Sequence, residues 1–193
     1  MKFTRLQIPD VFLIEPNIFK DNRGHFFESF SEKAISEFLG ESIKFVQDNE
    51  SFSTRGVLRG LHFQIPPFAQ TKLVRVVEGK VLDVAVDIRI GSETFGKYIS
   101  VVLDSIEKKQ LFIPRGFAHG FLVLSESAIF NYKVDNYYSS SHEMAILYND
   151  KEIGIDWESF ISDPILSSKD LAASQLKQIV GRITDFSIQN KLY

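Results

Sequence analysis

A long central stretch of the sequence, residues 45–148, consists almost entirely of short strand-like runs separated by turn residues. The clearest run is 81–89, in which aliphatic residues alternate with Asp83, Ala85 and Asp87. A period of two places the two sets on opposite faces of a strand. Because no β-α-β rhythm interrupts the stretch, a doubly wound α/β fold is excluded.

The other predicted strands follow one another at intervals of about 10 residues, a spacing typical of a β-sandwich or barrel. They are 72–77, 96–103, 109–113, 120–124, 128–134 and 144–148. The chain also contains 18 Phe and 6 Tyr, and aromatic residues favour pleated, half-buried surfaces. We therefore predict a mainly β fold, a barrel or sandwich with a few short peripheral helices.

One helix is predicted before the strands and one after them. Ser31 can cap the first, Gly40 can end it, and an apolar stripe at helical spacing runs between them. In the tail, 163–170 reads as a loop, 171–180 as a helix, and the last dozen residues as a frayed extension. The expected organisation is one domain, 1–193, with an N-terminal arm at about 1–45, the β barrel or sandwich at about 45–150 and a helical tail at about 157–193.

Composition excludes several classes of protein. Hydrophobic residues make up 44% and charged residues 24% of the chain, as in ordinary globular domains. No apolar run approaches the roughly 18 residues of a membrane span, and the N-terminus lacks a signal-peptide apolar stretch. A net charge of −3 gives no basic footprint for nucleic acid. The absence of cysteine removes disulfides and thiolate ligands and fits a reducing cytoplasm, where we expect the protein.

A Pro-x-Gly-x-x-His motif at residues 114–119 has the spacing of the cupin jelly roll and ends at His119. Metal-binding cupins present His-x-His and then a carboxylate in an earlier motif. Here the first His is His62, but Gln64 stands at the second position and Lys72 lies where the carboxylate would be. An ammonium group in a ligand sphere opposes a divalent cation. The sequence thus predicts a cupin-like barrel without a metal site.

Four polar residues converge on two neighbouring strands whose other face is apolar: Arg59, His62, Gln64 and Lys72. Burying such groups without a ligand or partner is costly, which indicates a functional site. His25 and His142, in contrast, have no comparable group of polar residues beside them in the sequence and are interpreted as ordinary polar residues.

The sequence resembles the dTDP-4-dehydrorhamnose 3,5-epimerase family in a series of segments that follow the family order over roughly residues 5 to 171. The matching segments are Asp21-x-Arg23-Gly24-x-Phe26-x-Glu28, Gln47-x-Asn49-x-Ser51, residues 56–64, Gln70-x-Lys72-Leu-Val, residues 83–89, residues 110–121, Tyr132-Lys133, Asn149-Asp150 and Ser168-Lys169-Asp170. Leu171 departs from the pattern, because relatives often have Arg there.

The resemblance implies a homodimeric enzyme that inverts C3 and C5 of dTDP-4-keto-6-deoxy-D-glucose without a cofactor, giving dTDP-4-keto-L-rhamnose. It implies His62 as the base and Asp170 as its orienting partner. Lys72, with Arg59 and His119, is expected to stabilise negative charge on O4. Tyr132 is expected to be the opposing acid, with a pKa lowered by nearby Lys72.

The same resemblance implies a set of substrate-binding residues. They are Arg23 and Arg59 for the diphosphate, Glu28 for thymine, Phe19 and Tyr138 for stacking, and Gln47 and Asn49 for the sugar pocket. Arg23 and Glu28 belong to the N-terminal arm, which in relatives crosses to the neighbouring subunit, so arm exchange within the homodimer is expected.

Three alternatives remain open at this point. The first is a related nucleotide-sugar enzyme: a 3-epimerase, a 5-epimerase or a 3,4-ketoisomerase. The second is a metal-dependent cupin that uses His62, Gln64 and His119. The third is a sugar-binding cupin without catalytic activity.

Overall fold

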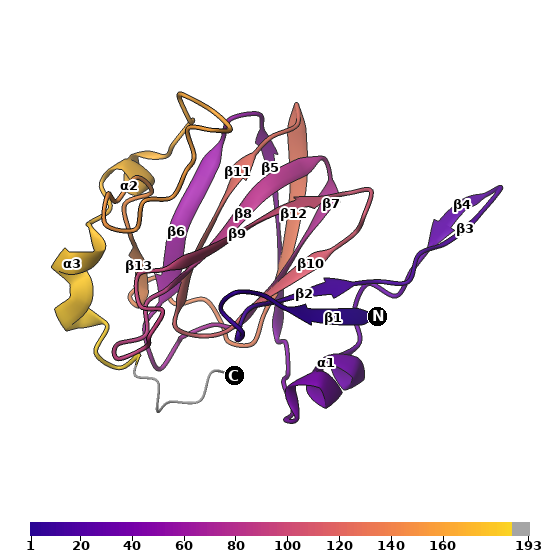
Figure 1. Ribbon diagram of the computed structural model, residues 1–193, viewed down its shortest axis with the longest axis horizontal. Coiled ribbons are helices and arrows are strands. Elements are labelled where there is room, and N and C mark those ends of the chain that lie inside the picture. The colour runs from indigo at the N-terminus through magenta and orange to yellow at the C-terminus, as the bar shows by residue number, and fades with distance from the viewer. Residues whose placement is uncertain (187–193) are drawn as a thin grey trace.

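The computed structural model describes residues 1–186, which form a barrel of two facing antiparallel sheets (Figure 1). One sheet has the order β1-β2-β10-β7-β12-β5 and the other β13-β6-β11-β8-β9. The strands of the first are β1 (Lys2–Arg5), β2 (Phe12–Glu15), β5 (Gln47–Thr54), β7 (Lys72–Glu78), β10 (Gln110–Ile113) and β12 (Ser127–Val134). Those of the second are β6 (Leu58–Gln64), β8 (Lys80–Asp87), β9 (Tyr98–Asp104), β11 (Phe117–Val123) and β13 (Glu143–Ala145). The predicted mainly β jelly roll is confirmed.

Strand β8 separates two apolar layers, as its alternation predicts. Leu82 and Val84 pack on the outer side of the five-stranded sheet, where the C-terminal segment covers them through Ile179 and other apolar residues. Val81 and Ala85 pack on the inner side, against the six-stranded sheet. Because both sides are covered, seven of the eight residues of β8 are buried.

Several strand boundaries differ from the prediction. β11 begins at Phe117 rather than at residue 120, and in place of the predicted strand 144–148 the chain forms β13, Glu143–Ala145, followed by an isolated bridge between Ile146 and Ser174. The N-terminal strands were not predicted, although β2 lies inside the six-stranded sheet between β1 and β10. Their runs of four residues are too short to show a period.

The first helix, α1 (Glu32–Leu39), is confirmed with both of its end signals. The Ser31 side chain accepts a hydrogen bond from the Ala34 N–H, and Gly40 ends the helix in the left-handed region at φ 80°. A residue with a side chain is strained in that conformation, so glycine suits the position. Ile35 is the buried residue that fixes the helix to the six-stranded sheet.

The predicted helix at 171–180 is wrong, because the chain forms the short helix α3 (Leu176–Ile179) and the 3-10 turn η1 (Val180–Arg182) there. The predicted loop at 163–170 is wrong at its end, where α2 (Ser168–Leu171) begins. The Asp150 carboxylate accepts a hydrogen bond from the N–H of Leu176, the first residue of α3, so α3 begins there as a separate helix. The expected frayed end is also wrong at Ile183 and Phe186, which are 0% and 5% exposed; residues 187–193 lie outside the described part. None of the helices in residues 1–186 is long and apolar enough to cross a bilayer.

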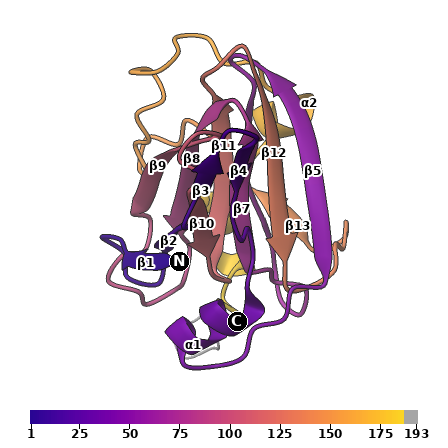
Figure 2. The ribbon, with the colours of Figure 1, turned by 90° about the vertical axis from the view of Figure 1, so that its right-hand side faces the viewer.

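A two-stranded hairpin, β3 (Phe19–Asp21) and β4 (Gly24–Phe26), points away from the barrel in Figure 1, and in Figure 2, where that side faces the viewer, it lies in front of the sheets. All six of these strand residues are exposed, and the rings of Phe19 and Phe26 are opposite each other in the register. A lone hairpin is marginally stable in water, so a surface that packs against it would stabilise it.

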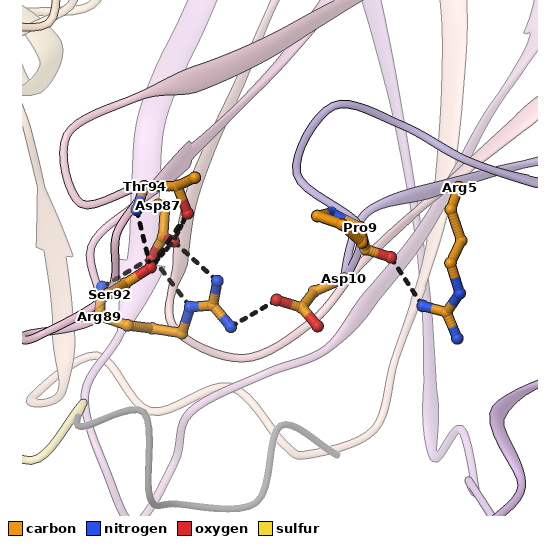
Figure 3. A network of polar contacts seen from close by, with 7 residues as sticks. All are labelled: Arg5, Pro9, Asp10, Asp87, Arg89, Ser92 and Thr94. Carbon is orange, nitrogen blue, oxygen red and sulfur yellow. Dashed lines mark hydrogen bonds and ion pairs between the residues drawn. The ribbon is translucent and has the colours of Figure 1, made fainter.

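A buried ion-pair network fixes the end of β8 to the turn between β1 and β2 (Figure 3). Asp87, which is 0% exposed, accepts hydrogen bonds from Arg89, Ser92 and Thr94, and Arg89 also pairs with Asp10 at 2.8 Å. Burial by itself would raise the pKa of Asp87, but the hydrogen bonds from Arg89 and Thr94 outweigh it and hold the pKa below its usual value. This stabilisation is therefore present at neutral pH and is lost as the pH falls through the lowered pKa.

We predict that Arg89→Met lowers the free energy of unfolding by about 3–5 kcal/mol, because it leaves a buried carboxylate without its cation. Urea denaturation at neutral pH measures the loss. Arg5→Met is the control, because Arg5 is exposed and donates only to the Pro9 carbonyl among the contacts in Figure 3. A loss for Arg89→Met of less than about 1 kcal/mol, the range of an exposed pair, would contradict the prediction.

Candidate active site

Two facing glycines bring β6 and β11 together at the floor of the barrel. A Cβ on Gly60 would lie 2.5 Å from the Gly120 Cα, and one on Gly120 would lie 2.7 Å from the Arg59 carbonyl oxygen. The register shifts at this point and pairs His62 directly with His119. Residues opposite each other on antiparallel strands share a face, so the two imidazoles enter the same side of the sheet.

That face opens into a cavity of about 220 Å³ between the two sheets. The five-stranded sheet contributes Arg59, His62 and His119, and the six-stranded sheet contributes Lys72 and Tyr132. The remaining lining residues are Glu50, Ser51, Phe63, Gln64, Gln70, Gly120, Phe121, Phe130, Tyr138 and Glu143. The structure therefore gathers six of the predicted site residues around one cavity, the five named above and Tyr138.

His62 makes a short contact with a carboxylate. Its Nε2 lies 2.6 Å from Asp170 Oδ1, and the second oxygen of Asp170 accepts a 2.6 Å hydrogen bond from Ser167, the cap of α2. Burial opposes ionisation of Asp170, but the hydrogen bonds from His62 and Ser167 prevail and lower its pKa. Asp170 is thus a carboxylate at neutral pH. It is bonded to Nε2 of His62, so Nδ1 of the same ring is left for a ligand.

His119 has a carboxylate partner of its own. Its Nε2 lies 3.1 and 3.0 Å from the two oxygens of Asp83, which is 0% exposed. Burial lowers the pKa of His119 more strongly than the Asp83 charge raises it, and Lys72 and His62 lower it further. His119 is therefore neutral at pH 7, with its one N–H directed to Asp83 and Nδ1 left as an acceptor.

Lys72 is the buried cation of the cavity. Its Nζ donates to the His62 carbonyl oxygen at 3.3 Å, and the residue is 8% exposed. Desolvation lowers the pKa of Lys72 to about 8, against the opposing effect of Asp83 and Glu143. The amine is still mostly protonated at pH 7, so it places a poorly solvated positive charge beside His62.

Tyr132 lies on β12, opposite Asn49 of β5 and across the cavity from the sheet that carries His62. Desolvation raises its pKa, and the negative charge of Glu143 raises it further, while Arg59 lowers it. The expectation that Lys72 lowers the pKa of this phenol is wrong, because burial and Glu143 dominate. Tyr132 is consequently a neutral hydroxyl at pH 7, able to donate a proton.

Gln47 and Asn49, the polar residues predicted for the sugar pocket, lie on β5, but they do not line the cavity, which Glu50 and Ser51 of the same strand do. Gln47 donates to Asn49 at 2.7 Å and accepts from the Tyr138 N–H at 3.3 Å. Arg59 donates to Ser53 at 3.0 Å and leaves much of its guanidinium exposed.

The predicted binding residues of the N-terminal arm are far from this cavity in the single chain. Phe19 and Arg23 belong to the projecting hairpin, where Arg23 pairs with Asp21 at 2.6 Å, and Glu28 follows it as an exposed residue. They do not line the cavity, and their binding roles stay predictions.

Two carboxylates of the site were not predicted from the sequence. Asp83 was noted only as part of the strand alternation and of a matching segment, although a carboxylate facing inward on a central strand is a signal of a buried pair. Glu143 gave no local signal. It bonds to the Tyr138 hydroxyl at 2.6 Å and pairs with Lys169 at 2.6 Å, contacts that only the fold brings together.

Nothing in residues 1–186 groups three or more His, Asp or Glu side chains in a way that could hold a metal ion. The Gln64 amide, at the position of a cupin ligand, is bonded to three backbone groups instead.

Comparisons with known proteins agree over almost the whole chain. The sequence profile of the dTDP-4-dehydrorhamnose 3,5-epimerase family matches residues 5–178. The dTDP-4-dehydrorhamnose 3,5-epimerase of Shigella flexneri is 54% identical over 171 residues, which cover 89% of this chain and 93% of the relative.

Solved structures give the same picture. A dTDP-6-deoxy-D-glucose-3,5-epimerase from Legionella pneumophila, in complex with dTDP-4-keto-L-rhamnose, matches with a TM-score of 0.90 at 48% identity, covering 94% of this chain and 96% of that one. A 3'-monoepimerase from Streptomyces bikiniensis, in complex with dTDP-quinovose, matches with a TM-score of 0.88 at 32% identity, covering 96% and 93%.

We predict that Tyr132 ionises above the value of about 10 that is normal for tyrosine, because burial and Glu143 oppose the phenolate. The ultraviolet absorbance of tyrosinate, recorded against pH for the wild-type chain and for Tyr132→Phe, gives its titration by difference. Tyr137→Phe is the control, since Tyr137 is 62% exposed. A difference curve for Tyr132 with a midpoint at or below about 10 would contradict the prediction.

Proposed function

Because the chain belongs to the dTDP-4-dehydrorhamnose 3,5-epimerase family, we propose that it inverts C3 and C5 of dTDP-4-keto-6-deoxy-D-glucose and forms dTDP-4-keto-L-rhamnose. One observation carries the proposal. His62 on one sheet, bonded to Asp170 of α2, and the neutral Tyr132 on the opposite sheet line the same cavity. Inversion of a carbon needs a base on one face of the sugar and an acid on the other.

His62 is the base that removes the protons from C3 and C5 of the sugar. The C4 ketone acidifies the hydrogens on C3 and C5, so a base alone can remove either one and no redox cofactor is needed. Asp170 holds one ring nitrogen, fixes the tautomer and stabilises the imidazolium that forms when the other nitrogen takes the proton.

The negative charge that develops on O4 is stabilised by Lys72. A buried ammonium with a pKa of about 8 gains most from a nearby oxyanion, because little water competes for it. His119 is neutral and gives its N–H to Asp83, so we assign it a binding role: its Nδ1 can accept from a sugar hydroxyl. Tyr132 then returns a proton from the opposite face.

The dTDP group binds outside the cavity. A volume of about 220 Å³ lies below the roughly 300–1,000 Å³ of pockets that enclose a drug-sized ligand, so it fits the reacting sugar alone. The nucleotide then extends over the rim, past Arg59 and Tyr138. Arg23, Glu28 and Phe19 have to reach that rim from elsewhere.

A second copy of the chain supplies them in a homodimer with exchanged arms. The projecting hairpin exposes Phe19 and Phe26 at 64% and 70%, and β5, the edge strand of the six-stranded sheet, exposes Phe52 at 63%. An apolar hairpin and an open edge strand are surfaces that association covers. We place this dimer in the cytoplasm, which the lack of cysteine fits.

A second candidate is inversion at one carbon only. The match with a 3'-monoepimerase at a TM-score of 0.88 supports it, because the fold and a cavity of this kind serve that reaction as well. The number of centres inverted is thus the point that the functional test has to decide.

We predict that the wild-type protein, given dTDP-4-keto-6-deoxy-D-glucose in heavy water, incorporates deuterium at both C3 and C5 with inversion, observed by proton NMR. Tyr132→Phe should still exchange these hydrogens with retained configuration, because His62 returns deuterium from its own face, while inverted product falls sharply. His62→Ala should lose both exchange and turnover, with kcat lower by about 100-fold or more.

The outcomes separate the candidates. Deuterium at one carbon only identifies a monoepimerase, and the absence of exchange together with tight dTDP binding identifies a sugar-binding protein. Inversion of both centres by Tyr132→Phe at the wild-type rate would remove Tyr132 from the mechanism.

We also predict that mixing Arg23→Ala chains with His62→Ala chains restores part of the activity. In a mixed dimer with exchanged arms, one site combines an intact His62 with an intact Arg23. Activity is measured after subunit exchange, which native mass spectrometry confirms. Mixed dimers that stay inactive would place Arg23 and His62 of one chain in the same site.

A further inference from the structure

Gln64 is a buried polar residue of the cavity wall that has no role in the proton transfers proposed above. It follows His62 by two positions on β6, so both side chains enter the barrel, and it is 4% exposed. A buried amide has two N–H donors and a carbonyl acceptor that need partners. The identity of those partners shows what the residue holds in place.

All partners of the Gln64 amide are backbone groups. Nε2 donates to the Phe68 carbonyl oxygen at 2.8 Å and to the Tyr137 carbonyl oxygen at 3.2 Å, and Oε1 accepts from the Ser139 N–H at 2.6 Å. Tyr137 and Ser139 stand immediately before and after Tyr138. One side chain therefore fixes the backbone on both sides of Tyr138 and links it to the segment between β6 and β7.

Residues 135–142, between β12 and β13, form the rim loop that carries Tyr138. Further bonds hold the loop to the same neighbouring segment: Gln70 donates to the Asn136 carbonyl oxygen at 2.8 Å, and Asn136 donates to the Pro67 carbonyl oxygen at 2.9 Å. Of these contacts, only those of Gln64 bracket Tyr138 itself.

Tyr138 is held in place but open to a ligand. Its N–H donates to Gln47 at 3.3 Å and its hydroxyl to Glu143 at 2.6 Å, yet the residue is 56% exposed and lines the mouth of the cavity. A ring that is exposed and fixed at the same time presents a surface for stacking without first having to be ordered.

We propose that Gln64 is a positioning residue for nucleotide recognition, which orders the rim loop so that Tyr138 meets the base of the bound nucleotide. The inference rests on the proposed function in taking a thymidine nucleotide as the ligand. Because Gln64 acts before any chemistry occurs, it contributes to affinity for dTDP and not to the rate of proton transfer.

The test is the binding of dTDP to Gln64→Met, measured by calorimetry. Methionine keeps the volume and loses the hydrogen bonds, so affinity should fall about tenfold, the factor that corresponds to roughly one lost hydrogen bond. If Gln64 acts through the loop, the same substitution in a Tyr138→Ala background should cost less than about threefold. KM for the sugar nucleotide should rise with kcat nearly unchanged.

Ser125→Ala is the matched control. Ser125 also joins backbone segments, accepting from the Lys80 N–H and donating to the Ser127 carbonyl oxygen, but it does not line the cavity. It should lower thermal stability and leave dTDP affinity unchanged.

Gln64→Glu gives a second, independent measurement. A carboxylate still accepts from Ser139 but repels the carbonyls of Phe68 and Tyr137, whereas a protonated carboxyl can donate to one of them. The ratio of the variant's Kd to the wild-type Kd should therefore fall as the pH is lowered.

The proposal is overturned if dTDP affinity of Gln64→Met stays within about twofold of wild type, if the loss is equally large without the Tyr138 ring, or if the Gln64→Glu ratio does not change with pH. Failure of the wild-type protein to bind dTDP would instead overturn the proposed function.

Discussion

The contact between Gly60 and Gly120 is the constraint on which the site depends. Because neither residue has a Cβ, β6 and β11 approach more closely than any pair with side chains could, and the register shifts beside them. The shift pairs His62 with His119 on the inner face of the sheet. Each histidine meets its own carboxylate, His62 meeting Asp170 and His119 meeting Asp83, and Lys72 donates to the His62 carbonyl oxygen.

The buried carboxylates of the barrel have hydrogen-bond partners, whereas its buried cation, Lys72, donates to a backbone carbonyl oxygen. Asp83 accepts the one N–H of His119 and favours the charged form of Lys72, while Asp170 is bonded to both His62 and Ser167. Lys72 remains the least satisfied, with its pKa lowered to about 8 by burial. A negative charge that develops on a ligand beside it is therefore stabilised more than the same charge would be in water.

Chemistry and recognition occupy different parts of the molecule. The reacting groups are on paired strands that pack on both sides, which keeps their positions fixed. Most of the proposed recognition groups are on the rim loop, β5 and the projecting hairpin, which carry exposed residues, while Arg59 and His119 are on paired strands of the barrel. Under the proposal made for Gln64, this buried residue affects binding by ordering the rim loop rather than by touching the ligand.

The sequence by itself determined the class of fold and the family. The period of two in 81–89, the Pro-x-Gly-x-x-His motif and the caps of α1 are local signals, and each was found where it was predicted. His62, Lys72 and Tyr132 were recognisable from their motifs and line one cavity. Tertiary structure alone decided the contacts between distant segments: Asp83 with His119, Glu143 with Tyr138 and Lys169, and the restart of the tail helix at Leu176. It also reversed the expected effect on Tyr132, because a pKa depends on burial and on every charge nearby, and neither quantity can be read from local sequence.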